Sequence, residues 1–399
     1  MKVLMINYME TTAPGGINKT VREIARNMSK MGHEIIVVQS NPLNLDNEEI
    51  YENFKIIRIP SICKNYLMGI NPELHSYLKN YQDRIAPDVV HIHGVHSLLS
   101  FQCILIIKYL NDRLPIIFSP HLDVAKSTLA GNYLWNIYTQ IGVRIFKSVT
   151  HITSCSNFEA NNIAHMFDVS PDKISIIPHG VDSIDLIKPC NVTHNIRLVY
   201  SGYLIKRKNV DYLLSGLNSL IYDYGVEKVL LTIIGEGPEK KTLLKMANRL
   251  KLTEHVIFKP FLPRDELIQE IKGSDIFLLL SESEAYGIVV AEALSQGTPC
   301  IVSNSTALNE FTNEIGCYGI DCPSDSRKLA QLILDIYEKK LKVGPLSNKI
   351  RTWDKVAEDY ELLYNMMLYQ NQQTSSNLQS KSDPENQLGS IYKIDSNLH

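Results

Sequence analysis

The chain has 399 residues, of which 44% are apolar and 21% charged; this is ordinary for a globular protein and long enough for two domains. The formal net charge of −3 provides no basic field, so we expect no nucleic-acid partner. The seven cysteines are scattered and form no C-x-x-C pair, which argues against a disulfide framework or a thiolate zinc site and favours a reducing compartment.

Short β-branched runs alternate with helical periodicities in the first half of the chain. Residues 2–7 (KVLMIN) predict a buried strand, apolar residues recur at helical spacing over 16–31, and 34–39 predict a second strand. Further strands are expected at 88–92, 115–118, 149–153 and 174–177. This alternation predicts a parallel sheet covered by helices on both faces.

The second half repeats this arrangement after a linker. Residues 178–195 contain two prolines, a glycine and little periodicity, which predicts an interdomain connection. Strands then follow at 196–200, 229–234, 255–258, 275–280 and 299–302. We therefore expect an α/β protein with two Rossmann-like, doubly wound parallel-sheet domains that face each other across a cleft, where ligands bind beyond the carboxyl ends of the strands.

The expected boundaries follow from these patterns. An N-terminal Rossmann-like domain is predicted over 1–185 and a C-terminal one over 186–350. A helix over 351–369 carries an apolar stripe and is predicted to cross back to the N-terminal domain. Residues 370–399 are rich in Asn, Gln, Ser and Lys and predict a disordered tail.

No segment of the sequence is apolar enough to indicate a secretory signal or a membrane span, so we expect a cytoplasmic location. The nearest candidate, 131–147, has aromatic residues together with Arg144 and Lys147. Such a helix suits peripheral contact with the inner face of a membrane. Packing against the N-terminal sheet as an ordinary amphipathic helix is the favoured interpretation.

Two glycine-containing turns follow predicted strands. Gly15 and Gly16 open a helix, where a backbone amide can approach a phosphate; a simple tight turn is the alternative. Gly235-Glu236-Gly237 is similar to the start of a dinucleotide fingerprint, but Lys240 stands where the third glycine belongs. The G-x-G-x-x-G pattern fails, so a nicotinamide cofactor is not expected.

A basic triplet, 206–208 (KRK), follows the strand at 196–200 and precedes a helix. Cations at the carboxyl end of a strand, beside a helix N-terminus, suit a pyrophosphate. A solvated basic turn is the alternative.

Glu284 and Glu292 lie eight positions apart in E-A-Y-G-I-V-V-A-E. Glu284 is predicted in a loop after the strand at 275–280, and Glu292 in the second turn of a helix that starts at Gly287. Because the neighbours of Glu292 are apolar, burying it is costly unless its carboxylate is paired or binds a ligand. Surface charge is the alternative for either glutamate taken alone.

Histidines gather near the ends of predicted strands. His91 and His93 lie on the same face of a strand, and His96 follows them. They suit a cleft-lining or structural role. A metal site is the alternative, but no carboxylate or cysteine at a suitable spacing completes it. His121 is expected at the cleft, two residues before Asp123, with a structural role as the alternative. No D-x-D occurs, the motif with which many transferases hold a divalent metal at the donor diphosphate. We therefore expect no metal and no cofactor, the diphosphate being neutralised by lysine, arginine and helix N-termini.

Together these residues resemble glycosyltransferase family 4, whose members are retaining, two-domain enzymes of the GT-B fold. The core of the resemblance is S-E-S-E-A-Y-G-I-V-V-A-E-A-L-S-Q-G-T-P-C-I-V-S over 281–303, which is similar to the family signature. Supporting matches are the glycine turn, His121, D-V-V-H-I-H-G at 88–94, I-I-P-H-G-V-D at 176–182 and G-Y-L-I-K-R-K-N at 202–209. The resemblance covers about residues 1–368.

The resemblance implies roles at the reacting centre. Glu284 and His121 would contact sugar hydroxyls and are the implied catalytic residues. Lys208, with Arg207, would bind the diphosphate, and Gly16 would place its backbone amide near that phosphate.

The remaining donor contacts are implied in the same way. Glu292 would hold the ribose hydroxyls, and the base would rest on the loop that contains Phe261 and Leu262. Gly287 belongs to the aromatic-glycine step of the signature, and the backbone near Leu308 would reach the sugar or the phosphate.

The implied reaction is transfer of a hexose-type sugar from a UDP- or GDP-sugar to a glycan or lipid-linked glycan, with retention and without a metal. Two places depart from the family pattern. Tyr203 stands where an arginine commonly binds the diphosphate, and 304–311 (NSTALNEF) lacks the usual glycine pair. A sugar-nucleotide epimerase of the same fold and an inactive nucleotide-sugar-binding partner subunit are the alternatives.

Overall fold

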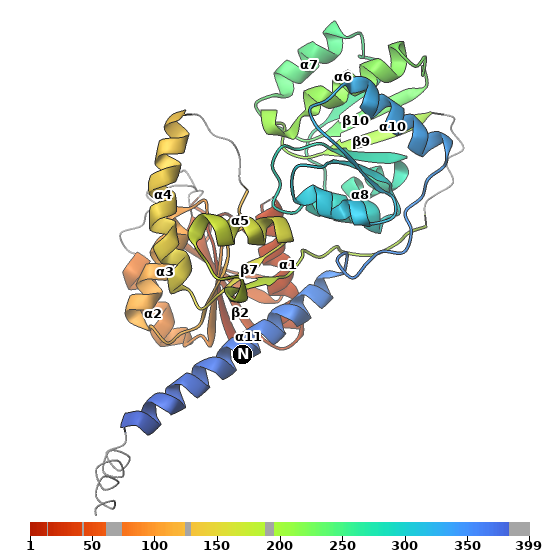
Figure 1. Cartoon of the computed structure of the whole chain (residues 1–399). Coiled ribbons are helices and arrows are strands. Elements are labelled where there is room, and N and C mark those ends of the chain that lie inside the picture. The colour runs from red at the N-terminus through yellow and green to blue at the C-terminus, as the bar shows by residue number, and fades with distance from the viewer. Residues whose placement is uncertain (14, 42–43, 61–73, 124–128, 188–194, 383–399) are drawn as a thin grey trace, which may run out of the picture. The chain divides into compact units, whose positions relative to one another are not determined.

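The structure, a computed structural model, describes the backbone of residues 1–13, 15–41, 44–60, 74–123, 129–187 and 195–382 (Figure 1). Contacts divide the chain into two units. Unit 1 comprises Met1–Pro120, Arg144–Ile152 and the chain from Ala357 onward. Unit 2 comprises His121–Val143 and Thr153–Val356.

The first sheet is parallel at its centre. Its parallel strands include β1 (Lys2–Asn7), β2 (Glu34–Asn41), β4 (Phe54–Pro60), β5 (Val89–His93), β6 (Ile116–Ser119) and β7 (His151–Ser154). The order is β3-β4-β2-β1-β5-β6-β7-β8, with β8 at Ile174–Ile176. β1 pairs with β2 on one side and β5 on the other, so Met5 lies between Val37 and His91. Nearly every residue of these three strands is buried, as expected for strands covered on both faces.

An edge hairpin was not predicted from the sequence. β3 (Glu48–Tyr51) pairs antiparallel with β4, and β4 pairs parallel with β2. The pairing places Tyr51 opposite Phe54, with two residues between them, which is a hairpin connection. β3 alternates exposed and half-buried residues, as an edge strand does.

Helices cover the first sheet. They are α1 (Gly16–Lys30), α2 (Leu74–Ile85), α3 (Leu98–Leu110), α4 (Leu129–Ser148), α5 (Asn157–Phe167) and the short η1 (Pro171–Lys173). α1 packs against β1 and β2. Its apolar residues Val21, Ile24, Ala25 and Met28 are fully buried, and Ile17 is partly buried, which confirms the stripe predicted over 16–31.

The helix predicted over 131–147 is confirmed as part of α4. Near its end, Phe146 packs edge-on against Phe118 of β6 with ring centroids 5.1 Å apart, so this part of the helix packs on the sheet. Ile141, Arg144 and Lys147 are exposed. Among the residues that the structure describes, no helix is both long and apolar enough to cross a membrane.

The second sheet lies in unit 2 and is parallel throughout. Its order is β11 (Val256–Lys259), β10 (Val229–Ile234), β9 (Ile196–Ser201), β12 (Ile276–Leu279), β13 (Cys300–Ser303) and β14 (Cys317–Ile320). The chain runs outward from β9 to β11 and then returns to the other side of β9 as β12. This reversal is a topological switch point, and in such sheets ligands bind beyond the carboxyl ends of the two strands that flank it.

Helices lie on both faces of the second sheet. They are α6 (Val210–Tyr222), α7 (Lys240–Arg249), α8 (Arg264–Gly273), α9 (Ile288–Ser295), α10 (Ser326–Glu338) and the short η2 (Lys206–Lys208) and η3 (Ala307–Asn313). α6 packs on α7 and α10, whereas α8 packs on α9 (Figure 1). The doubly wound fold predicted for this half is therefore present.

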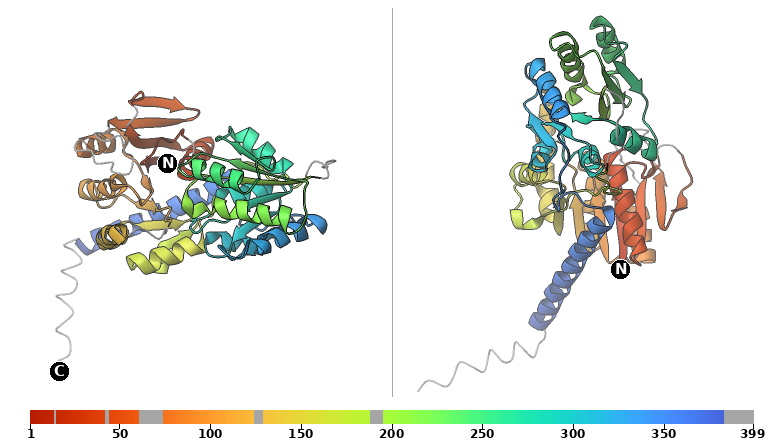
Figure 2. Two further views of the ribbon diagram at one scale, coloured as in Figure 1. Left: turned by 90° about the horizontal axis from the view of Figure 1, so that it is seen from above. Right: turned by 90° about the vertical axis from the view of Figure 1, so that its right-hand side faces the viewer.

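Helix α11 (Trp353–Ser382) is 30 residues long and unbroken (Figures 1 and 2). From Ala357 it belongs to unit 1, where Tyr364 is fully buried and bonded to His91. The expectation of disorder from residue 370 is wrong for 370–382. No proline or glycine interrupts those residues, and an existing helix extends at little cost. Residues 383–399 of the expected tail and 188–194 of the expected linker lie outside the described residues.

Candidate active site

The loops that follow β9 and β12 bring two predicted site residues together. Lys208 ends η2, and Glu284 lies in the loop between β12 and α9. The Lys208 ammonium contacts the Glu284 carboxylate, and the Ser281 hydroxyl donates to the same carboxylate oxygen at 3.0 Å. The side chains of Lys208 and Glu284 keep 13% and 17% of their surface exposed, so the pair is largely shielded yet reachable.

A second ion pair lies beside the first. The Arg207 guanidinium and the Ser283 hydroxyl both contact the Asp123 carboxylate. Burial of Asp123 opposes its ionisation, but Ser283 and Arg207 outweigh burial, so the pKa of this carboxyl lies below its ordinary value. Two cations and two carboxylates therefore form two ion pairs at the switch point.

The backbone joins these loops. The Glu282 amide donates to the Arg207 carbonyl at 2.8 Å, and the Asn209 side-chain amide donates to the Leu280 carbonyl at 2.9 Å. Asn209 has φ 51°, a left-handed conformation that asparagine tolerates well. The turn from η2 into α6 is thus fixed against the end of β12, which sets where Lys208 meets Glu284.

His121 lies in a buried cluster of unit 2. Its ring centroid is 5.5 Å from that of His179, and the potential ligand atoms of His121, Cys155 and His179 all lie within 4.8 Å of one another. Burial, reinforced by the Glu159 carboxylate, raises the pKa of the Cys155 thiol well above its ordinary value. The thiol donates to Glu159 at 2.9 Å. Two imidazoles and a thiol are donor types that metals such as zinc bind, so this cluster combines a packed polar arrangement with a possible ligand set.

Glu159 holds the backbone beside His121. This carboxylate, 1% exposed, accepts from the Leu122 amide at 2.6 Å, the Cys155 amide at 2.8 Å and the Ser154 hydroxyl at 3.0 Å. Burial raises the pKa of Glu159, although these donors oppose the rise. Because Leu122 lies between His121 and Asp123, Glu159 positions both of these residues.

Glu292 is buried in α9, as the sequence indicated, and it is paired. Its side chain is 1% exposed and lies 2.5 Å from Nη2 of Arg264, the first residue of α8. Nε of Arg264 donates to Asp182 at 2.7 Å. Arg264 thus joins the predicted ribose ligand to the segment that follows β8.

Gly287 and Leu308 meet at the start of α9. Gly287 is the N-cap with φ 101°, and a Cβ added there would lie 2.4 Å from Cδ2 of the buried Leu308. The Leu308 amide donates to the Thr306 hydroxyl at 3.1 Å and so caps η3. Glycine is therefore required both by the backbone and by the packing.

The base-binding loop predicted after β11 carries an exposed aromatic residue. Phe261 is 41% exposed, and its ring is stacked with that of Tyr203, with centroids 6.2 Å apart and planes 17° apart. Leu262 is partly buried against the core of unit 2. Tyr203 thus meets a predicted base-binding residue.

The loop after β1 lies in unit 1 and leads to Gly16, the first residue of α1. Glu10 in this loop forms a buried two-point ion pair with Arg58 of β4, with oxygen–nitrogen distances of 3.0 and 3.1 Å. The Gln39 amide donates to Glu10 at 2.6 Å. Although burial opposes it, these partners hold the pKa of Glu10 below its ordinary value.

The strand histidines are engaged within unit 1. The rings of His91 and His93 lie 4.0 Å apart, as expected for one face of β5. His91 bonds Tyr364 at 2.6 Å and Ser119 at 2.7 Å. Both of its ring nitrogens therefore have hydrogen-bond partners in the core, which favours the structural interpretation of His91.

Two family models match this chain, one for each half. The family model "Glycosyltransferase Family 4" matches residues 14–183, and "Glycosyl transferases group 1" matches residues 189–353. The chain is a family 4 glycosyltransferase. This glycosyltransferase is 23% identical over 365 residues to a glycogen synthase of Mycobacterium tuberculosis. The aligned region covers 85% of this chain and 86% of the relative. It is 23% identical over 323 residues to the alpha-monoglucosyldiacylglycerol synthase of Streptococcus pneumoniae, covering 75% and 70%.

Among solved structures, the glycosyltransferase is similar to Anabaena HepE in complex with UDP and glucose. The TM-score is 0.66 at 17% identity, and the match covers 95% of this chain and 100% of HepE. This likeness shows the fold, which is GT-B.

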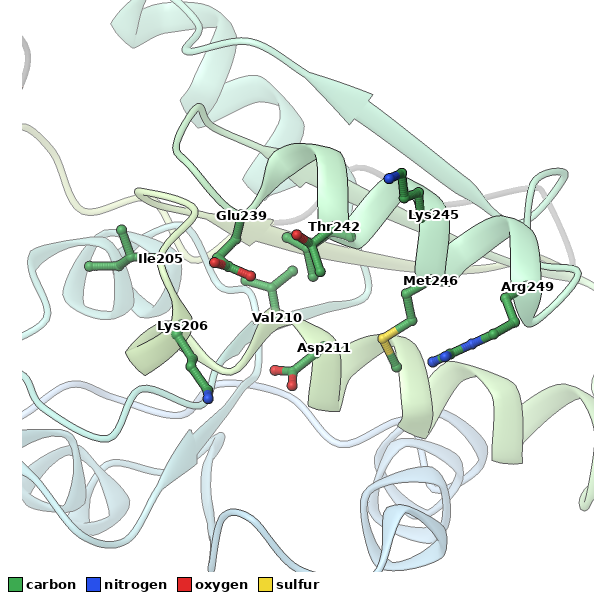
Figure 3. Close-up of a pocket in the computed structure, with 10 residues that line it drawn as sticks. Ile205, Lys206, Val210, Asp211, Glu239, Thr242, Lys245, Met246 and Arg249 are labelled. Carbon is green, nitrogen blue, oxygen red and sulfur yellow. The ribbon is translucent and has the colours of Figure 1, made fainter.

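A pocket of about 500 Å³ lies elsewhere in the glycosyltransferase, between the start of α6 and α7 (Figure 3). It is lined by Ile205, Lys206, Val210, Asp211, Glu239, Thr242, Leu243, Lys245, Met246 and Arg249. Lys206 lines this pocket, whereas its neighbours Arg207 and Lys208 pair with Asp123 and Glu284. The basic triplet is therefore divided, and two of its three charges lie at the switch point.

Sequence reasoning missed three residues of the glycosyltransferase site: Glu159, Ser283 and Arg264. One signal for Arg264 was available, because a cation in the first turn of a helix is disfavoured by the helix dipole unless carboxylates neutralise it. Glu159 and Ser283 carried no such signal, since an acidic residue in a first turn and a serine in a loop are both common.

Proposed function

We propose that this glycosyltransferase moves a hexose-type sugar from a UDP- or GDP-sugar to a glycan or lipid-linked glycan, with retention of the anomeric configuration and without a metal. The observation that carries the proposal is the contact of Lys208 with Glu284 at the switch point of unit 2. A cation suited to a diphosphate and a carboxylate suited to sugar hydroxyls are adjacent there, as the diphosphate and the sugar of a nucleotide sugar are.

The cations act on the leaving group. When the bond between the anomeric carbon and the diphosphate breaks, negative charge grows on the phosphate and positive charge on the sugar. Lys208, with Arg207 beside it, stabilises the phosphate more as its charge grows, and this lowers the barrier. A diphosphate that binds Lys208 competes with Glu284 for the ammonium and leaves the carboxylate available to the sugar.

The carboxylate and the histidine orient the sugar. Glu284 accepts hydrogen bonds from sugar hydroxyls, and His121 contacts a further hydroxyl. Retention follows from attack on the face that the diphosphate leaves, with a leaving-group oxygen taking the proton of the acceptor. Glu284 is not proposed as a covalent nucleophile.

The rest of the donor is held by the other predicted residues. Glu292, oriented by Arg264, binds the ribose hydroxyls. The loop of Phe261 and Leu262 supports the base, and the backbone at Gly287 and Leu308 borders the sugar. No divalent ion is required, because Lys208 and Arg207 supply the positive charge.

The acceptor class is supported by the relatives. Their names describe a synthase of glycogen, a glycan, and a synthase of a glucosyldiacylglycerol, a glycolipid. A lipid-linked acceptor would bring the enzyme to the inner surface of the membrane. Ile141, Arg144 and Lys147 on α4 give an exposed apolar and basic edge that suits such peripheral contact.

The experiment starts with thermal shifts against UDP, GDP, ADP and their common sugar conjugates, because a ligand of the folded state raises the melting temperature. The donor with the largest shift is then incubated with oligosaccharide and glycolipid acceptors. Proton NMR of the product reports the anomeric configuration. We expect a new glycoside with the donor's configuration.

Three other outcomes would overturn the proposal in different ways. An epimerised nucleotide sugar without a glycoside would indicate an epimerase. Binding with neither transfer nor slow donor hydrolysis would indicate an inactive nucleotide-sugar-binding subunit. A glycoside of inverted configuration would remove the proposed retention.

A further inference from the structure

Tyr203 occupies the position where the family pattern commonly has a phosphate-binding arginine, yet a tyrosine has no cationic group. Its ring faces Phe261, the exposed aromatic residue of the loop after β11. We infer that Tyr203 and Phe261 together form the stacking surface for the heterocyclic base of a nucleoside diphosphate. This inference rests on the proposed function and assigns Tyr203 to the base instead of the phosphate.

The order of the strands explains why the two residues meet. Tyr203 follows β9 and Phe261 follows β11, which are separated in the sheet by β10. The loop after β10 is compact, because a Cβ at Gly235 would lie 1.9 Å from the Gly202 carbonyl oxygen and one at Gly237 would lie 2.3 Å from that of Leu204. Glycines at these two positions let the loops on either side approach each other.

The backbone that carries Tyr203 is held on both sides. The Gly202 amide donates to the Ile234 carbonyl at 3.0 Å, and the Leu204 amide donates to the Glu236 carbonyl at 2.9 Å. The Tyr200 hydroxyl donates to the Tyr203 carbonyl at 3.3 Å. A ring on such a fixed backbone loses little freedom when it stacks on a ligand.

Exposure distinguishes this pair from ordinary packing. Tyr203 is 53% exposed and Phe261 is 41% exposed, whereas the buried Tyr200 nearby is 0% exposed. Although the two rings are stacked on each other, both leave aromatic surface exposed to solvent. Covering such a surface with a planar base is favourable.

The position relative to the cations agrees with this assignment. Lys208, proposed at the diphosphate, lies five residues beyond Tyr203 and is separated from it by the start of η2. A nucleoside diphosphate has its base at one end and its phosphates at the other. The aromatic pair and the cation therefore suit opposite ends of one ligand.

The test compares ligands with and without a base. Dissociation constants for UDP, GDP and inorganic pyrophosphate are measured by calorimetry on the full chain and on Tyr203→Ala, Tyr203→Phe and Phe261→Ala. Tyr222→Ala is the control, because Tyr222 is a 57% exposed tyrosine of the same unit outside the proposed site. For whichever of UDP and GDP the parent binds more tightly, we expect Tyr203→Ala and Phe261→Ala to weaken binding about tenfold. Pyrophosphate affinity and Tyr203→Phe should stay within about twofold of the parent.

Several results would overturn the inference. Equal loss of pyrophosphate and nucleotide affinity in Tyr203→Ala, or a loss in Tyr203→Phe, would place the Tyr203 hydroxyl at the phosphate. Unchanged nucleotide affinity in Tyr203→Ala would remove the stacking role and leave the proposed function intact. If the parent binds neither UDP nor GDP, the proposed function and the inference fail together. Thermal denaturation of each variant distinguishes lost contacts from lost folding.

Discussion

The Lys208 ammonium contacts the Glu284 carboxylate, although these residues are 76 positions apart and follow different strands of the same sheet. The strands β9 and β12 are neighbours because the winding of the sheet reverses between them. The contact therefore follows from topology, and it brings two opposite charges to the place where a doubly wound sheet binds its ligand.

Glu284→Gln should lower transfer by about 100-fold or more, since an uncharged amide accepts weaker hydrogen bonds from the sugar in the transition state. Initial rates with the identified donor measure this. Glu282→Gln is the matched control, because Glu282 is exposed in the same loop. Full activity of Glu284→Gln in a folded protein would remove the residue from the reacting centre.

Lys208→Ala should weaken donor and free nucleoside diphosphate alike, by about 10- to 100-fold, because both lose one charge-assisted contact to phosphate. Calorimetry with both ligands measures the change. Lys206→Ala, which alters the pocket beside α7, should have a smaller effect. Equal effects of the two substitutions would indicate a diffuse basic field in place of a defined phosphate site.

Gly287→Ala should destabilise the protein by about 2 kcal/mol more than Gly225→Ala does. Both glycines have positive φ, 101° and 71°, but a Cβ at Gly225 meets nothing within 4 Å, whereas one at Gly287 meets Leu308. The difference combines the steric contact with Leu308 and the larger backbone strain of a side chain at φ 101°. Denaturant unfolding of the two variants gives the comparison, and equal losses would show that η3 yields to the added methyl group.

Glu10→Gln should be less stable than the parent at pH 7, and the difference should shrink below about pH 4. The pKa of Glu10 is lowered in the folded chain. The stability that its charge contributes is thus present above the unfolded pKa and is lost as the pH falls through the folded pKa. Melting temperatures across this range measure it, with the exposed Glu254→Gln as the control. A difference independent of pH would mean that the ion pair with Arg58 contributes packing alone.

Chelators should leave transfer unchanged, because Lys208 and Arg207 are proposed to neutralise the diphosphate. The rate is measured before and after treatment with EDTA and with phenanthroline. A loss of activity that zinc restores would instead assign a metal to His121, Cys155 and His179, whose ligand atoms lie close enough for one.

The sequence predicted the parallel architecture well because buried parallel strands are continuous apolar runs, such as residues 2–7 and 229–234. It missed β3 and β14, which are short and lie at sheet edges, where burial constrains the sequence pattern less. It also missed β4, an interior and largely buried strand whose apolar residues are interrupted by Lys55 and Arg58. The positions of Glu284 in a loop and Glu292 in a buried helix were also predicted correctly. The ion-pair partners of these two glutamates were harder to predict from the sequence. The contact of Glu292 with Arg264, for example, depends on how α8 packs against α9, and no local sequence pattern indicates it.

Helix α11, which ends the described chain, shows a second feature that composition did not predict. Composition predicted disorder from residue 370, yet α11 continues to Ser382. A polar composition indicates that a segment cannot build a hydrophobic core of its own. A polar segment can still extend a helix whose earlier turns are packed, and the turns of α11 around Tyr364 are packed in this way.

Glu159 has a consequence for the interpretation of random mutagenesis. Its carboxylate binds the amide of Leu122, the peptide unit that separates His121 from Asp123. A selection scored by activity alone would group Glu159 with those two residues and suggest that it meets the sugar. Glu159 would instead act indirectly, through its hydrogen bond to the main chain at Leu122. Positions at which substitution abolishes activity will therefore include residues that hold the site in place as well as residues that contact the substrate.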